Sequence, residues 1–167
     1  MTQHKQVPVE WRGRRAEVDE EMAPLILALW RAGIATRLSC QENQPGIAWI
    51  AFATPEDARK FLNRVAVYPD PADLREGDGR TYVGNVPFWE TLYGRITGCG
   101  DEGNWDYRVW VDDFGVSEEL VGDELGTTHV GPADFEFNVS IRFPRTDMPL
   151  ILERLKLTRG VRKRKSA

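Results

Sequence analysis

Residues 135–143 read FEFNVSIRF and alternate between apolar and polar side chains without a break. A period of two predicts a β-strand whose apolar side is buried and whose polar side is open. The apolar side carries Phe135, Phe137, Val139, Ile141 and Phe143, and the polar side carries Glu136, Asn138, Ser140 and Arg142. A sheet built from such strands needs a layer of helices on one face only, which limits the chain to a small set of two-layer folds.

The same order of strand and capped helix occurs twice. The apolar run 47–53 is followed by Thr54, Pro55 and, three residues after the threonine, Asp57, an arrangement typical of a helix start. The strand that ends at Phe143 leads to a second helix, capped near Thr146. Each of these strands follows another alternating run, and the tetrapeptide PLIL occurs at 24–27 and at 149–152. This predicts two β-β-α halves sharing one sheet, although chance also explains a repeated leucine-rich tetrapeptide.

A further helix is predicted over residues 20–32, capped by Asp19, with an apolar stripe of Met22, Leu25, Ile26 and Leu29. We expect a hairpin over residues 7–18 that turns near Gly13. The segment 68–86 is rich in Pro, Gly and Asp and is interpreted as a connection, followed by a short helix.

The predicted fold class is therefore α+β, with a mostly antiparallel sheet of four to six strands. Helices 20–32, 55–66 and 147–156 are expected on one face of it. We expect one domain over residues 1–157, with candidate halves 1–67 and 87–157, and a basic, flexible tail over 158–167.

Composition narrows the class of protein. No apolar run approaches the roughly 20 residues needed to cross a bilayer, and the N-terminus has no apolar signal core. Two cysteines do not make a disulfide framework, so a reducing cytoplasm is the expected location. The net charge of −4 argues against non-specific binding of nucleic acid.

Charge is unevenly distributed along the chain. Residues 101–124 hold nine acids against Arg108 alone, and residues 151–167 hold seven bases against Glu153. Such blocks are typical of interaction surfaces or solvated tails. A mimic of DNA phosphates is one hypothesis for the acidic segment, but its glycines and its aromatic strand disfavour a continuous charge array.

No catalytic residue, metal site or cofactor is predicted from motifs. The two histidines, His4 and His129, and the two cysteines, Cys40 and Cys99, lack the spacing of metal ligands. Cys40, in the run SCQE, has no adjacent base, and Glu42 disfavours its thiolate, so we interpret it as a half-buried residue at a sheet corner. The run GCGDEG carries two acids that would repel a phosphate.

The polar side of the predicted sheet is the candidate binding surface. On residues 105–112, alternation places Trp110 with Asp106, Arg108 and Asp112 instead of among the apolar residues. Tryptophan, arginine, serine and asparagine on an open sheet can stack a planar ring and hold a phosphate. The candidate ligand-binding residues are Arg37, Ser39, Arg108, Trp110, Asn138, Ser140 and Arg142. A solvated face or a self-association surface is the alternative.

Residues 18–42, VDEEMAPLILALWRAGIATRLSCQE, are similar to a pattern in small, uncharacterised actinobacterial and phage proteins. In that pattern an acidic helix start and an apolar helix precede Gly-Ile-x-Thr-x-x-Ser-Cys. The same stretch more faintly resembles the tRNA wybutosine-synthesising protein 3 family. That family has a TTSSCSGR-like strand and loop, which this chain matches at Thr36, Ser39 and Cys40. Gln41, Glu42 and Asn43 stand where that family has Ser-Gly-Arg. This second resemblance implies S-adenosylmethionine-dependent methylation of a modified tRNA guanosine.

Two functions from different classes follow. The first is a non-enzymatic binding or interaction protein, phage-derived in one interpretation, whose open sheet face takes a nucleotide-like, small anionic ligand or a protein partner. The alternative is an S-adenosylmethionine-dependent enzyme that modifies a nucleotide or RNA. A membrane partner is not expected, and a homodimer is left open.

Overall fold

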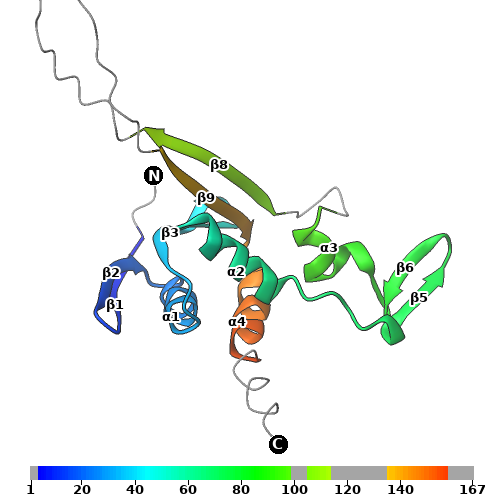
Figure 1. Cartoon of the computed structure of the whole chain (residues 1–167). Helices are drawn as coiled ribbons and strands as arrows, with labels where there is room; N and C mark the ends of the chain where they lie inside the picture. The colour runs from blue at the N-terminus through cyan, green and yellow to red at the C-terminus, as the bar shows by residue number, and fades with distance from the viewer. Residues whose placement is uncertain (1–3, 99–104, 114–134, 158–167) are drawn as a thin grey trace, which may run out of the picture.

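The main sheet has four antiparallel strands. The structure, a computed structural model, describes residues 4–98, 105–113 and 135–157, and only the backbone of 111–113, 135–136 and 157. The strands lie in the order β3 (Thr36–Gln44), β4 (Ile47–Phe52), β9 (Phe135–Pro144) and β8 (Asp106–Asp113). This antiparallel sheet confirms the predicted α+β class (Figure 1).

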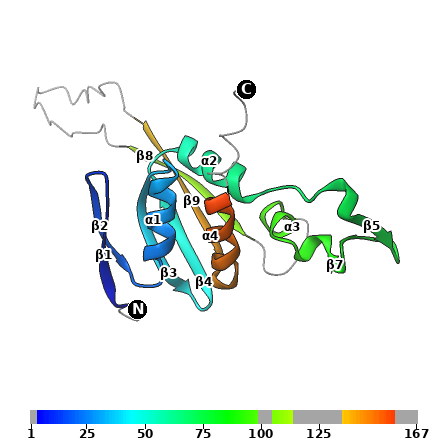
Figure 2. The same ribbon diagram turned by 90° about the horizontal axis from the view of Figure 1, so that it is seen from below.

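Three helices cover one face of this sheet, as predicted. They are α1 (Ala23–Arg31), α2 (Pro55–Val65) and α4 (Met148–Leu157), and both ribbon views place them on the same side (Figures 1 and 2). The strands bury every second side chain against them. The fully buried members include Ile50 and Phe52 of β4, Ile141 and Phe143 of β9, and Phe61 of α2.

The sheet consists of two hairpin-and-helix units, β3–β4–α2 and β8–β9–α4, which confirms the β-β-α arrangement. Their inner strands, β4 and β9, pair with each other, so that Ala48 lies opposite Phe143 and Ile50 opposite Ile141. A single domain over 1–157 stays a prediction, and the tail 158–167 lies outside the described residues.

The predicted helix caps have mixed outcomes. Thr54 caps α2, because its side chain accepts a hydrogen bond from the Asp57 backbone N–H at 3.1 Å, and Pro55 is the first helical residue. Asp19 does not cap α1, whose N-cap is Met22 without a side-chain bond. Thr146 lies exposed inside a 3₁₀ turn, η3 (Arg145–Asp147), that precedes α4, so the expected cap there is wrong.

The N-terminal hairpin is confirmed. Strands β1 (Gln6–Trp11) and β2 (Arg14–Asp19) pair antiparallel across a turn at Arg12 and Gly13, which have φ of 48° and 81°. Two successive positive φ angles are typical of the tight turn that matches strand twist. The hairpin lies beside α1, where the Arg31 guanidinium is 5.1 Å from the centre of the Trp11 ring (Figure 2).

Segment 68–86 is more than a connection. It contains the 3₁₀ turn η1 (Pro71–Asp73) and a small sheet of β5 (Leu74–Gly77), β6 (Arg80–Val83) and β7 (Val86–Pro87). The β5–β6 turn uses Asp78 and Gly79, both at positive φ, a recognised hairpin signal that the interpretation as a connection overlooked. A 3₁₀ turn, η2 (Phe88–Glu90), and the expected short helix, α3 (Leu92–Ile96), follow.

No helix in the described part of the chain is long and apolar enough to cross a membrane. Most of the acidic segment 101–124 lies outside the described residues, as do Cys99 and His129.

Candidate functional site

The face of the sheet opposite the helices is the open face. Directly opposed residues in an antiparallel pair project to the same side, so the register assigns each residue to a face. Trp110 opposes Asn138, Arg108 opposes Ser140, and Asp106 opposes Arg142. Arg142 and Ser140 in turn oppose Trp49 and Ala51 of β4. The expected placement of Arg108, Trp110, Asn138, Ser140 and Arg142 on one face is confirmed.

This face carries a hollow of about 560 Å³, within the range of small-molecule sites. Its open-face lining residues are Trp49, Arg108, Trp110, Ser140 and Arg142, joined by Tyr107 and Val109 of β8. Ser140 and Asn138 are 2% and 1% exposed, so polar groups lie beneath the more exposed Trp110 and Arg108. We name this the open-face hollow.

Among the described side chains, two guanidiniums and one carboxylate carry the charges beside the hollow. The Asp106 carboxylate accepts hydrogen bonds from Arg108 at 3.2 Å and from Arg142 at 3.3 Å. Arg142 is further fixed by Asn43, whose side-chain oxygen accepts from its Nε at 3.1 Å. One carboxylate therefore holds two guanidiniums, of which Arg108 is the more exposed, at 61% against 17% for Arg142.

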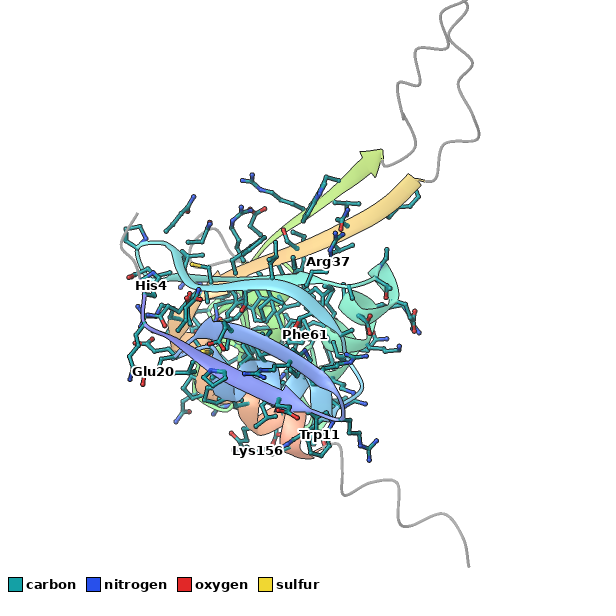
Figure 3. All side chains as sticks on the ribbon, turned by 90° about the vertical axis from the view of Figure 1, so that its left-hand side faces the viewer. His4, Trp11, Glu20, Arg37, Phe61 and Lys156 are labelled. Atoms are coloured by element: carbon teal, nitrogen blue, oxygen red, sulfur yellow. The ribbon has the colours of Figure 1, made fainter. Side chains whose placement is uncertain are left out.

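Arg37 also belongs to the open face. Figure 3 shows Arg37 on the side of the sheet away from Phe61, and its guanidinium donates a hydrogen bond to Asn138 Oδ1 across β4. The contact spans β4 where that strand presents the small Ala51. Arg37, which lies in β3, thus reaches the polar residues of β9 on the open face.

Ser39 does not share this face, which corrects its predicted placement. The β3 register shifts between Thr36 and Leu38, an irregularity of the β-bulge type, so Leu38 opposes Ala51 and Ser39 opposes the fully buried Ile50. Simple alternation through residues 34–39 fails because one extra residue moves every later side chain to the other face.

The hollow contains an unused hydrogen-bond donor. Trp49 Nε1 is buried and has no partner among the described residues. A buried N–H without an acceptor costs about 1–3 kcal/mol, so this atom adds to the polar character beneath the hollow.

Tyr107 lies on the helix side of β8. Its hydroxyl donates to the Ile96 carbonyl at 2.5 Å, and burial raises the pKa of this hydroxyl above its usual value. The phenol therefore stays protonated and ties β8 to α3.

Cys40 is not at a corner. It lies within β3, opposite Trp49, and the turn to β4 comes later, at Pro45 and Gly46. Burial, reinforced by the nearby Asp19 carboxylate, raises the pKa of the Cys40 thiol, although the Glu42 backbone partly opposes this. A raised pKa disfavours the thiolate that a nucleophile needs.

The structure brings together three side chains that sequence spacing did not connect. One ligand-type atom from each of His4, Asp19 and Cys40 lies within 4.8 Å of the other two. The residues precede β1, end β2 and lie within β3, so no short motif unites them. Only the docking of the hairpin against β3 reveals the cluster.

The β8–β9 hairpin also exposes apolar side chains. Val109 is 66% and Phe137 54% exposed, although both belong to the helix side of the sheet by alternation. The two strands extend past the helices in Figure 1, so no helix in the described part of the chain covers this end of the hairpin.

Comparisons with known proteins give one distant viral similarity. The chain is 26% identical over 148 residues to Uncharacterized protein R428 of Acanthamoeba polyphaga mimivirus. The match covers 86% of this chain and 63% of that protein, so the chain spans under two thirds of its relative. No family model matches, and no solved structure matches. The actinobacterial and wybutosine resemblances gain no support from these comparisons.

Proposed function

We propose that this chain is a non-enzymatic binding protein whose open-face hollow takes a nucleotide-like ligand, a planar ring joined to a phosphate. The observation that carries the proposal is the pairing of Trp110 with Arg108 and Arg142 around the hollow. A ring stacked on an aromatic side chain gains about 1–3 kcal/mol per base. A guanidinium binds phosphate through two parallel hydrogen bonds.

The polar side chains of Asn138 and Ser140, which lie beneath these groups, support the same ligand class. Asn138 and Ser140 can hydrogen-bond a ring edge or a sugar hydroxyl, and Arg37 already orients Asn138. Since Asp106 and Asn43 hold Arg142 in place, little side-chain entropy is lost when an anion binds. The similarity to a viral protein supports a viral origin, and a phage origin is part of this proposal.

The test is a fluorescence titration of the full chain with purine and pyrimidine nucleosides and their 5′-monophosphates. Trp110→Ala should weaken binding of both forms about tenfold, in line with the stacking energy. Arg108→Ala should weaken only the phosphorylated form, because the guanidinium contacts the phosphate.

Matched controls exist elsewhere in the chain. Arg59 on α2 matches Arg108 in exposure, at 64% against 61%, and each is bound to one carboxylate, Arg59 to Glu56 at 2.7 Å and Arg108 to Asp106. Because Arg59 lies away from the hollow, Arg59→Ala should leave ligand binding unchanged. Trp89, which lies under Arg80 away from the main sheet, is the control tryptophan. Equal losses in the Arg59 and Arg108 variants, or no saturable binding by the parent chain, would contradict the proposal.

The same titration with S-adenosylmethionine addresses the enzymatic alternative. This ligand carries a sulfonium cation and lacks phosphate, so the proposed hollow should bind it no better than a nucleoside. Tight saturable binding would favour the modifying enzyme instead.

A protein partner is the second candidate, favoured by the exposed Val109 and Phe137. Contiguous exposed apolar side chains commonly mark interaction sites. Co-purification from a host lysate should then depend on Phe137→Asp and not on Arg108→Ala, since the two residues lie on opposite faces of the hairpin.

A further inference from the structure

The cluster of His4, Asp19 and Cys40 lies at the outer edge of the main sheet, where Cys40 of β3 opposes Trp49, a lining residue of the open-face hollow. Figure 3 shows His4 where the start of the N-terminal hairpin approaches the edge strand β3. The three candidate ligand atoms, a ring nitrogen, a carboxylate oxygen and a sulfur, all lie within 4.8 Å of one another.

Asp19 is the least ordinary member of this cluster. It is 6% exposed, yet no lysine or arginine within residues 4–98, 105–113 and 135–157 forms an ion pair with its carboxylate. Buried carboxylates are normally paired with a cation or coordinate a metal. One oxygen, Oδ2, accepts from the Gln41 backbone N–H at 2.9 Å, which fixes the orientation of the group.

Gln41 supports the cluster from a second side. Its side-chain amide nitrogen lies 3.1 Å from His4 Nδ1, and its oxygen accepts from the Glu21 backbone N–H at 3.2 Å. Metal-ligating carboxylates are usually oriented by outer hydrogen bonds, as Asp19 is by the Gln41 backbone N–H, whereas the Gln41 amide nitrogen only places the His4 ring beside it. One residue therefore contacts two of the three candidate ligands.

We propose that His4, Asp19 and Cys40 bind a divalent cation of the zinc class. Zinc accepts nitrogen, sulfur and oxygen ligands at about 2.0–2.3 Å, which sets tetrahedral ligand separations of roughly 3.3–3.8 Å. A shift of about 1 Å would bring the cluster into that geometry. Calcium and magnesium prefer all-oxygen sites, so the thiol excludes them.

Charge and proton balance are consistent with this cation. On binding, the S–H bond of Cys40 breaks, a sulfur–metal bond forms, and the proton passes to solvent. A thiolate and a carboxylate then neutralise the two positive charges, and His4 contributes as a neutral ring. A water molecule completes the four ligands.

The bound cation would attach the N-terminal hairpin to the main sheet. Strands β1 and β2 form a sheet of their own, and a two-stranded hairpin is marginally stable in isolation. Ligands before β1, at the end of β2 and within β3 connect all three strands through one ion.

The test uses the full chain, stripped with a chelator and titrated with Zn²⁺ by calorimetry and with Co²⁺ by absorption. We expect one equivalent to bind and Co²⁺ to show the charge-transfer band of a thiolate ligand. Cys40→Ser should abolish that band and weaken Zn²⁺ binding at least about 100-fold, since changes to outer partners alone cost 10–100-fold. His4→Asn and Asp19→Asn should weaken binding to a similar extent.

The chain supplies its own controls, because it has two cysteines and two histidines. Cys99→Ser and His129→Asn should keep both the band and the affinity. Zn²⁺ should also raise hydrogen-exchange protection in β1, β2 and β3 of the parent chain, a readout that does not depend on any variant folding. Absence of saturable binding, or a band that survives in Cys40→Ser, would overturn the proposal. A band lost in Cys99→Ser would overturn it equally.

Discussion

The two β-β-α units share a topology but hold the start of their helices in different ways. In the first unit, the buried Asp57 accepts a hydrogen bond from the Thr54 hydroxyl, 2.8 Å away and three residues earlier. In the second, the buried Asp147 accepts from Trp105 Nε1 at 3.0 Å and from Arg95, which lie before β8 and in α3. The first aspartate closes a local cap, whereas the second connects three elements that are far apart in sequence.

This difference predicts unequal costs of removing the two aspartate contacts. The ring of Trp105 packs between Phe61 and Phe143, with centroids 5.9 and 5.1 Å away. Asp147 therefore orients a central core side chain as well as neutralising Arg95. In the first unit the cap affects mainly the first turn of α2.

The largest expected effect is that of Asp147→Asn. It removes the charge partner of Arg95 inside the protein, and breaking such a pair costs about 3 kcal/mol when the remaining charge is largely buried. Urea unfolding should show a lower midpoint with an unchanged slope. Glu153→Gln, on an exposed position of α4, is the control and should change stability by less than about 0.5 kcal/mol. Equal stability of the two variants would remove the distinction between the units.

A smaller effect is expected for Thr54→Ala in the first unit. The change removes the acceptor for the Asp57 N–H and should cost about 1 kcal/mol. Thr146→Ala tests the corresponding place in the second unit, where the threonine is exposed in η3 and should be neutral. A cost at Thr146 matching that at Thr54 would show that α4 is capped locally after all.

These units also show what the sequence could predict. The cap of α2 was predictable because Thr54, Pro55 and Asp57 form a local signal whose spacing is set by helix geometry. The contacts of Asp147 were not, because its partners lie 42 and 52 residues away and only the packed fold brings them together.

The residues of the open face were likewise predictable where a local pattern places them. Regular alternation placed Arg108, Trp110, Asn138, Ser140 and Arg142 correctly, because β8 and β9 pair without a register shift. Ser39 was misplaced because β3 contains a shift that no residue type marks. The cluster of His4, Asp19 and Cys40 was missed because its residues come from separate strands and meet only when the hairpin docks.

The outer strands of the two units provide the last contrast. Strand β3 of the first unit is approached by the N-terminal hairpin, whose Asp19 bonds to Gln41, while β8 forms the opposite edge of the sheet. Cys40 should therefore react as a partly buried thiol beside a carboxylate. In a Cys99→Ser background with chelator present, iodoacetamide should label Cys40 more slowly than free cysteine at neutral pH.

The pH dependence follows from the raised pKa of the Cys40 thiol. The folded state binds this proton more tightly than the unfolded state, so the contribution to stability is complete below the ordinary thiol pKa and is lost as pH rises through the folded value. Labelling should accelerate over the same alkaline range, since only the thiolate reacts.

Cys40→Ser without metal should lower the free energy of unfolding by about 1 kcal/mol, as expected for a half-buried side chain. If Cys40 were labelled faster than free cysteine at neutral pH, its thiolate would be stabilised. That result would contradict the placement of the Asp19 carboxylate beside the thiol, because a nearby negative charge disfavours the thiolate.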